Sequence, residues 1–417
     1  MNEVRLAATA DLHLDVDGLE ETVRVARRMT EAMAAAEVNR ALFAGDTTHR
    51  KQPHPDVWAA LAYILEPLAL SGTCVDFCAG THDCLALGAE HSATSAFAKL
   101  YTDNAIYRQT GVLAHNVAEL QRDEELNILW LPHAVLGRFA AAYPDATFDQ
   151  TVEGAKAALR GLVSLPPPND GRPSIIVGHW SPHSATRSGS PTKAGDLPSD
   201  ITVNAYDCHA GYACLILGHE HKPQHGGAWT ASEDATWAIP GPQAWVVPGA
   251  IEQRTWADEG EEKSWCLLRL RKAKEVPGDP PAEPPWQPSL ERIPTGCRER
   301  LTARMSLADA EIGLPGSLLP GQFMEPEKYI LRVQVEHREG EIVPFAQIRD
   351  ALDVGPAVEV EGQVTERREV VRVTAMRSER CLLENLDESL TENPPEPPEI
   401  APEVMGLGAE LVQEVQG

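Results

Sequence analysis

The sequence predicts an α/β fold, on the evidence of five short apolar runs and one helical pattern. The runs suit buried strands, and they cover Leu6 to Thr9, Ala41 to Ala44, Val75 to Ala79, Ser174 to Val177, and Cys214 to Leu217. Residues Leu19 to Val38 follow the first run and repeat apolar side chains at helical spacing. This helix is expected to pack on the sheet that the strands form.

Asp or His residues follow all five runs. The segments are Asp11-Leu12-His13, Gly45-Asp46-Thr47-Thr48-His49, Gly80-Thr81-His82-Asp83, Gly178-His179 and Gly218-His219-Glu220-His221. In open α/β sheets, ligands bind beyond the carboxyl ends of the strands. Five such ends can therefore converge on one crevice, which is the arrangement that a metal centre requires.

Two of these segments pair potential ligands at a spacing of two residues. Asp11 with His13, and His219 with His221, each have both side chains on one side of an extended segment. Each pair is therefore able to grip one ion. Carboxylates with imidazoles suit Mn²⁺, Fe²⁺ or Zn²⁺, and the absence of a thiolate argues against a structural zinc site. Asp46 is a candidate bridge between two ions.

Such a centre predicts phosphoryl chemistry. Two ions roughly 3.5 to 4 Å apart activate a water between them and stabilise the attacking and leaving oxygens of an in-line displacement. His82 is then the proton donor to the leaving oxygen. We expect Asp83 to hold the His82 imidazole in the useful tautomer and to raise its basicity. These features together predict a two-metal phosphoesterase.

The five segments resemble the pattern D-x-H, G-D-x-x, G-N-H-D, G-H and G-H-x-H of the calcineurin-like metallophosphoesterase superfamily, over roughly the first half of the chain. The resemblance implies a sandwich of two sheets flanked by helices. The residues around these motifs are similar to those of the SbcD-type nucleases of double-strand-break repair. The matching segments are Thr9 to Leu14, Ala44 to His49, Leu217 to Gln224 and Val247 to Glu252.

The resemblance implies a role for each matched residue. One ion would be held by Asp11, His13, Asp46 and His221, and the other by Asp46, Thr81, His179 and His219. His82 would be the catalytic histidine, and His49 would handle the DNA strand near the metals. Thr81 departs from the family pattern, which has Asn there. Because a hydroxyl is a weaker ligand than an amide carbonyl, the second site is expected to bind metal less tightly or to take an extra water.

Composition limits the class of protein. The chain has 417 residues, 43% of them hydrophobic, which predicts more than one domain. It has no signal-peptide pattern and no apolar run of membrane-spanning length, so a cytoplasmic location without membrane contact is expected. The eight cysteines are scattered and predict reduced thiols. A net charge of −26 argues against unaided binding to DNA, whose phosphates are neutralised by Lys and Arg.

The later part of the chain divides by composition. Residues 1–275 would form the nuclease domain, and the proline-rich segment 276–288 a stiff linker. Alternating residues predict strands at Tyr329 to Glu336 and Val358 to Val364, with a helix over Pro344 to Leu352 between them. Residues 289–380 would thus be a small α+β domain, in which the resemblance implies a capping role. Residues 381–417 form an acidic tail with a possible partner-binding helix over 403–416.

The main prediction is a two-metal DNA exonuclease and endonuclease that acts with an SbcC-type, SMC-like coiled-coil ATPase and forms a homodimer. Mn²⁺ is the ion that the resemblance favours, with Fe²⁺, Zn²⁺ and Mg²⁺ as alternatives. The alternative function is a metal-dependent phosphodiesterase or phosphatase that acts on a nucleotide or phosphoprotein, which accounts for the acidity directly. A third interpretation, a scaffold whose site has decayed at Thr81, would require that the chain bind no pair of ions.

Overall fold

The structure is a computed structural model, which describes residues 3–84, 92–102, 112–115, 118–133, 143–187, 201–229, 244–273, 285–311, 328–338, 341–351 and 359–366. The chain divides into two compact units. The first comprises residues 1–301 and 324–330, and the second comprises 302–323 and 331–417. Within the described residues, no helix is both long and apolar enough to cross a membrane. The tail at 381–417 and its predicted helix lie outside the described residues.

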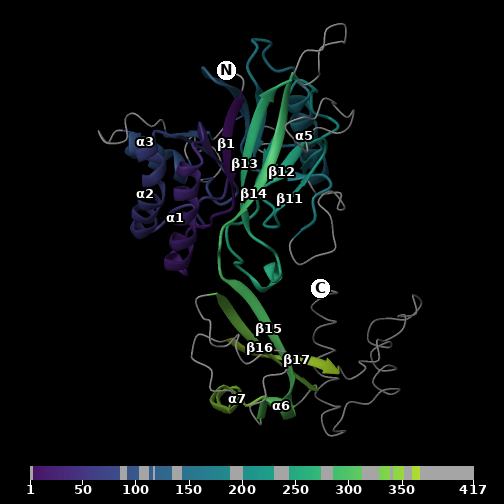
Figure 1. Cartoon of the computed structure of the whole chain (residues 1–417). Coiled ribbons are helices and arrows are strands. Elements are labelled where there is room, and N and C mark those ends of the chain that lie inside the picture. The colour runs from purple at the N-terminus through teal and green to yellow at the C-terminus, as the bar shows by residue number, and fades with distance from the viewer. Residues whose placement is uncertain are drawn as a thin grey trace, which may run out of the picture. The chain divides into compact units, whose positions relative to one another are not determined.

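The first unit contains two six-stranded sheets (Figure 1). The strands of the first sheet, in spatial order, are β14 (Trp286–Pro294), β13 (Ser264–Lys272), β1 (Glu3–Thr9), β2 (Arg40–Phe43), β3 (Cys74–Cys78) and β4 (Val112–His115). Strands β1 to β4 are parallel, while β13 and β14 are antiparallel additions at one edge. The predicted strands near residues 6, 41 and 75 are confirmed.

The second sheet also contains four adjacent parallel strands. In spatial order its strands are β11 (Gln224–Gly226), β12 (Trp245–Val247), β10 (Leu215–Leu217), β7 (Ser174–Gly178), β6 (Asn127–Leu131) and β5 (Glu119–Arg122). The four inner strands are parallel, and both edge strands are antiparallel to their neighbours. A two-stranded ribbon, β8 (Ser181–Pro182) with β9 (Thr202–Val203), completes the strands of this unit.

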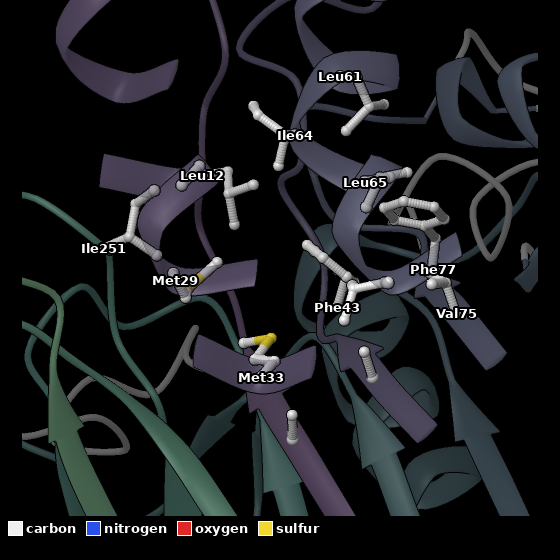
Figure 2. Packing of buried hydrophobic residues seen from close by; sticks show 14 of the residues in the cluster. Leu12, Met29, Met33, Phe43, Leu61, Ile64, Leu65, Val75, Phe77 and Ile251 are labelled. Atoms are coloured by element: carbon white, nitrogen blue, oxygen red, sulfur yellow. The ribbon is translucent and has the colours of Figure 1, made fainter. Parts of the chain in front are cut away.

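The two sheets pack face to face, with helices on both outer faces. Alternate residues of β1 and β7, such as Leu6 and Ile175, are buried in one cluster that both sheets share. The opposite face of the first sheet packs against α1 (Leu19–Ala35) and α2 (Pro55–Ser71), as Figure 2 shows for residues such as Met29 and Phe43. The second sheet packs on α5 (Phe148–Val163). The predicted α/β sandwich of two sheets flanked by helices is confirmed.

The helices of the first layer end where local chemistry requires it. Helix α1 stops three residues before the predicted Val38 because Glu37 adopts a left-handed backbone, with φ of 52°. Helix α2 continues through Pro67, which has no N–H for the carbonyl of Tyr63. The guanidinium of Arg27 donates to that carbonyl instead, so α1 satisfies the group that the proline leaves open. Helix α3 (Ala93–Thr102) lies beside β4.

The predicted linker differs from the structure at its end. Residues 274–284 lie outside the described part, but Trp286 to Pro288 begin β14, which pairs with β13 along its whole length. The prolines of β14 are tolerated because it is an edge strand, whose outer N–H groups need no partner in the sheet. The many prolines of this segment therefore predicted an unpaired linker up to Pro288, whereas Trp286 to Pro288 belong to an edge strand. The domain boundaries drawn from the sequence otherwise stay predictions.

The second unit carries the predicted α+β elements. Its sheet has the order β15 (Glu299–Ser306), β16 (Tyr329–Arg338), β17 (Glu359–Glu366), with β16 and β17 parallel. Helix α7 (Phe345–Ala351) lies between these two strands in sequence, and α6 (Leu307–Glu311) follows β15. The predicted strands and helix at 329–364 are thus confirmed, while the capping role stays a prediction.

Candidate metal centre

The predicted site residues come together at the carboxyl ends of the parallel strands. Asp11 and His13 follow β1, Asp46 follows β2, and His179 closes β7. His219 and His221 follow β10. Among the residues that the structure describes, three groups of side chains have ligand atoms within 4.8 Å of one another, namely Asp11 with His13 and His221, Asp46 with His179 and His219, and His13 with His49 and His82.

The backbone of this region is held in uncommon conformations. Five described residues other than glycine have positive φ, and four of them are Asp11, His13, Asp46 and His219. Such conformations cost of order 1–3 kcal/mol each and persist only where the surroundings enforce them. Here the loops after β1 and β2 enforce them, because Asp11 N donates to Gly45 O at 3.0 Å and His13 N to Asp46 O at 2.9 Å. The strain coincides with the predicted ligands.

The first cluster joins Asp11, His13 and His221. The Nε2 atoms of His13 and His221 are 3.1 Å apart and face each other, and together with a carboxylate oxygen of Asp11 they lie within the reach of one ion. Asp11 is fully buried, and its carboxylate accepts a hydrogen bond from His219 N at 3.1 Å. Burial raises the pKa of Asp11 well above its ordinary value, and burial lowers the pKa of His13 to about 2. The imidazole of His13 is therefore neutral and able to coordinate a cation.

The second cluster joins Asp46, His179 and His219. His179 Nδ1 donates to the carbonyl oxygen of Ala44 at 2.8 Å, which turns Nε2 toward Asp46 Oδ2 at 3.2 Å. Burial opposes a charge on both groups, but the pair outweighs it, so the pKa of Asp46 falls below its ordinary value and that of His179 rises to about 10. The protonated imidazole of His179 thus supplies the positive charge beside the Asp46 carboxylate.

Glycines make this close approach possible. A Cβ atom on Gly45 would lie 2.1 Å from His179 Nδ1, and one on Gly218 would lie 2.0 Å from the carbonyl oxygen of Ala44. Similarly, a Cβ on Gly80 would lie 2.2 Å from Asp46 Oδ1. The three glycines therefore let three loops pass against the ligand side chains without a clash.

The donor set fits divalent cations. Asp46 Oδ2 lies 3.2 Å from His179 Nε2 and 3.7 Å from His13 Nε2, so one carboxylate oxygen reaches both clusters. Among the described residues, Thr81 Oγ1 is buried and has no hydrogen-bond partner. Because buried polar atoms normally have one, this oxygen is available to a bound cation. Carboxylate and imidazole are the ligands that Mn²⁺, Fe²⁺ and Zn²⁺ accept.

The partner of His82 differs from the prediction. Its Nδ1 lies 2.8 Å from the carbonyl oxygen of His49, to which it is placed to donate, and its own backbone N donates to Asp46 Oδ1 at 2.7 Å. The side chain of Asp83 is instead fully buried, and it accepts hydrogen bonds from the backbone N–H groups of Gly80 and Thr48 at 3.0 Å each. The expected orientation of His82 by Asp83 was therefore wrong, because both carboxylate oxygens of Asp83 are occupied by backbone N–H groups.

His49 lies at the open side of the site. Its ring stacks on that of His82 with the centroids 5.0 Å apart, and it is exposed. Burial, partial as it is, lowers the pKa of His49, and the charge of His82 adds to the effect. The structure thus places His49 next to the predicted acid and beside the first cluster, which agrees with a position near a substrate, while its role stays a prediction.

Sequence reasoning missed three residues of the centre. His133 follows β6, and its ring stacks on Trp180 with the centroids 5.0 Å apart. The signal was present, because Asn127 to Leu131 is a sixth apolar run that leads to a histidine. Arg254 donates to the carbonyl oxygen of Leu12, between two ligands of the first cluster.

The third missed residue is Lys263. It is almost fully buried, and its Nζ donates to the carbonyl oxygen of His221 at 3.0 Å. No feature of the sequence marks Lys263, because its importance depends on the folding back of the 249–263 segment.

No protein-family model and no curated protein sequence matches the chain. Solved structures with a resemblance include a dimetal phosphatase from Danio rerio, at a TM-score of 0.35 and 10% identity, over 66% of this chain and 94% of that one. Another is GAP50, described as the anchor in the inner membrane complex of Plasmodium, at a TM-score of 0.39 and 11% identity, over 71% and 85% of the two chains. At such scores neither likeness bears on function, which rests on the geometry of the site.

Proposed function

We propose that the protein is a metal-dependent phosphoesterase that uses two divalent ions. The observation that carries the proposal is the position of Asp46, whose Oδ2 atom lies within 3.7 Å of His13 Nε2 and 3.2 Å of His179 Nε2. One carboxylate is thus shared by two adjacent clusters. A shared carboxylate between two sets of histidines is the arrangement that a two-metal site requires.

The residues of the chain have distinct tasks in this mechanism. Asp11, His13 and His221 would hold one ion, and His179 and His219 the other, with Asp46 between them. Divalent ions bound there supply Lewis-acid chemistry, since they lower the pKa of water and offset charge on phosphoryl oxygens. Burial lowers the pKa of His13, His49 and His221, and the charge of Arg254 adds to the effect. The guanidinium of Arg254, which also contacts Glu252 Oε1 at 3.1 Å, thus brings a positive charge near the first cluster.

His82 would supply the proton for the leaving group. Its Nδ1 is engaged with the carbonyl oxygen of His49, so in the protonated ring the Nε2–H is the group left to donate. The side chain is half-buried, which leaves it accessible to an ester from the open side of the site. His82 would thus act as general acid, a role that typically contributes about 10²- to 10⁴-fold to a rate.

A small or nucleotide phosphoester is the substrate class that the chain favours. A net charge of −26 disfavours unaided binding to a long polyanion. DNA remains a second candidate, which the similarity to SbcD-type nucleases supports. A cavity of about 560 Å³ beside the loop after β10 is lined by both signs of charge, Arg187, Lys222 and Arg292 with Glu259, Glu261 and Glu262, so it does not by itself favour a polyanion. The homodimer, the SbcC-type ATPase partner and the cytoplasmic location are proposals that rest on the sequence alone.

A panel of substrates tests the function. The protein would be incubated with Mn²⁺, Zn²⁺ or Mg²⁺ and with 4-nitrophenyl phosphate, bis(4-nitrophenyl) phosphate, cyclic nucleotides and end-labelled duplex and single-stranded DNA. Asp46→Asn is the test variant, and Asp145→Asn, an exposed carboxylate far from the site in sequence, is its matched control. We expect metal-dependent hydrolysis of the small esters that Asp46→Asn loses and Asp145→Asn keeps.

The outcomes separate the candidates. Cleavage of DNA that also depends on Asp46 would move the nuclease from second candidate to first. If the wild-type chain binds no metal ions and hydrolyses no ester of the panel, the proposal is overturned and the scaffold interpretation takes its place.

A further inference from the structure

We propose that His133 is a ligand of the ion at the second cluster, where it supplies the donor that Thr81 lacks. The inference rests on the proposed two-metal function and deepens it, because it assigns a third imidazole to that ion. Three nitrogen donors with the Asp46 carboxylate favour borderline ions such as Zn²⁺, Fe²⁺ or Mn²⁺ over Mg²⁺, which prefers oxygen donors.

The position of the His133 ring supports this assignment. Its centroid lies 5.9 Å from that of His219 and 6.1 Å from that of His179, while the centroids of His179 and His219 are 5.2 Å apart. The His133 ring thus lies next to both imidazoles of the second cluster. Its nitrogens are farther from the cluster than the ligand atoms of Asp46, His179 and His219, which lie within 4.8 Å of one another, so coordination requires its side chain to move closer.

Unpartnered atoms point to the same place. Within the described residues, His133 Nδ1 and Thr81 Oγ1 are both buried and have no hydrogen-bond partner. They come from the loops after β6 and β3. Buried polar atoms without partners are rare in folded proteins, and a cation bound at the second cluster would give both of them a partner.

Chemistry favours His133 over Thr81 as the effective ligand. A neutral hydroxyl is a weak donor to a divalent ion, whereas neutral imidazole is a common transition-metal ligand. His133 is also well anchored, since its backbone N donates to Ala79 O at 2.9 Å and its ring stacks on Trp180. Trp180 in turn donates from Nε1 to Leu131 O at 3.0 Å. The ring is held by packing, and its Nδ1 has no hydrogen-bond partner.

The test is His133→Phe, which keeps a ring for Trp180 but removes both nitrogens. The full chain, freed of metal by a chelator, would be titrated with Zn²⁺ and with Mn²⁺ by calorimetry, and bound ions would be counted after dialysis. We expect two ions per wild-type chain and one per variant chain, with the second Kd weakened at least about 100-fold. His183→Phe, at an exposed histidine of β8 and its turn, is the matched control and should bind two ions.

A second variant ties the effect to coordination. Adding Thr81→Asn to His133→Phe supplies an amide oxygen to the same ion, so the second ion should return. If His133→Phe fails to fold, as judged by circular dichroism of the metal-free chain, His133→Leu takes its place, with the same count of bound ions and the same titration.

Binding of both ions by His133→Phe at wild-type affinity would overturn the ligand assignment and leave the phosphoesterase proposal standing. A wild-type chain that binds fewer than two ions would instead contradict the proposed function itself.

Discussion

The Nζ atom of Lys263 donates a hydrogen bond to the carbonyl oxygen of His221 at 3.0 Å. The same ammonium group contacts the carboxylates of Asp258 and Glu261 at 2.8 Å each. Lys263 is almost completely shielded from water, so its charge is compensated only by these partners. The ammonium group therefore fixes the backbone of His221, a predicted ligand of the first cluster, and does not itself contact the ion.

Replacing Lys263 by Met should destabilise the fold and weaken the first metal site together. Loss of one partner leaves buried carboxylates uncompensated, at a cost of about 3–5 kcal/mol. The freed His221 carbonyl should lower metal affinity by about 10- to 100-fold, as outer-sphere changes do. Urea unfolding and calorimetric titration would measure the two effects. Lys272→Met, an exposed position at the end of β13, should change stability by less than about 0.5 kcal/mol.

The partner Asp258 predicts a pH dependence. Burial raises the pKa of Asp258, but the charge and hydrogen bond of Lys263 outweigh this and leave it below the ordinary value. A depressed folded-state pKa stabilises the fold above the unfolded pKa of about 4, and this stability is lost as pH falls through the lower folded value. The gap in unfolding free energy between wild type and Asp258→Asn should therefore be full at pH 7 and shrink below pH 4 or so. A gap that grows on acidification would contradict this, and Asp145→Asn should show none.

Removal of the His82 side chain should slow hydrolysis in a way that depends on the leaving group. His82→Ala is expected to lower kcat by about 10²- to 10⁴-fold for alkyl esters, whose leaving oxygen must be protonated. The loss should be much smaller for 4-nitrophenyl esters, because 4-nitrophenolate leaves without a proton. Steady-state kinetics over a series of esters would measure the trend, with His183→Ala as the control. An equal loss for every ester would argue for a role other than general acid.

Asp83 should matter for stability more than for protonation of the leaving group. Its carboxylate accepts from three backbone N–H groups, those of Thr47, Thr48 and Gly80. In Asp83→Asn one of these donors meets an NH₂ group, at a cost of about 1–3 kcal/mol for each buried donor left without a partner. Denaturant unfolding should show this loss, while the leaving-group dependence of kcat stays as in the wild type. If Asp83→Asn instead kept wild-type stability but showed a steeper dependence of kcat on the leaving group, the hypothesis that Asp83 orients His82 would be supported again.

The parts of the centre that the sequence predicted are those in which a local pattern carries the information. An apolar run followed by Asp or His shows that a strand ends in a ligand, as at Asp46 and His179, and parallel strands bring such ends to one edge. The side to which a residue points inside a tight loop is a tertiary property, so the contacts of Asp83 were not predictable. The role of Lys263 was not predictable for the same reason, because its partners come together only when the chain folds back before β13.

His133 was missed for another reason. Its apolar run, Asn127 to Leu131, has the same form as the others, but Pro132 separates the run from the histidine and no second ligand stands beside it. Only the packing of β6 next to β7 brings this side chain toward the second cluster. A search for every apolar run that leads to a histidine would have included it.

The hydrogen bond between His219 N and the Asp11 carboxylate joins residues that are 208 positions apart. A chain emerging during synthesis therefore presents Asp11 long before the segment that must meet it, and both sheets have to associate before the site exists. Contacts between such distant positions form late, because the closure of a long loop costs entropy that only the completed packing repays. Tight metal binding would accordingly mark the finished fold, and the appearance of bound metal during refolding would time the last step of its assembly.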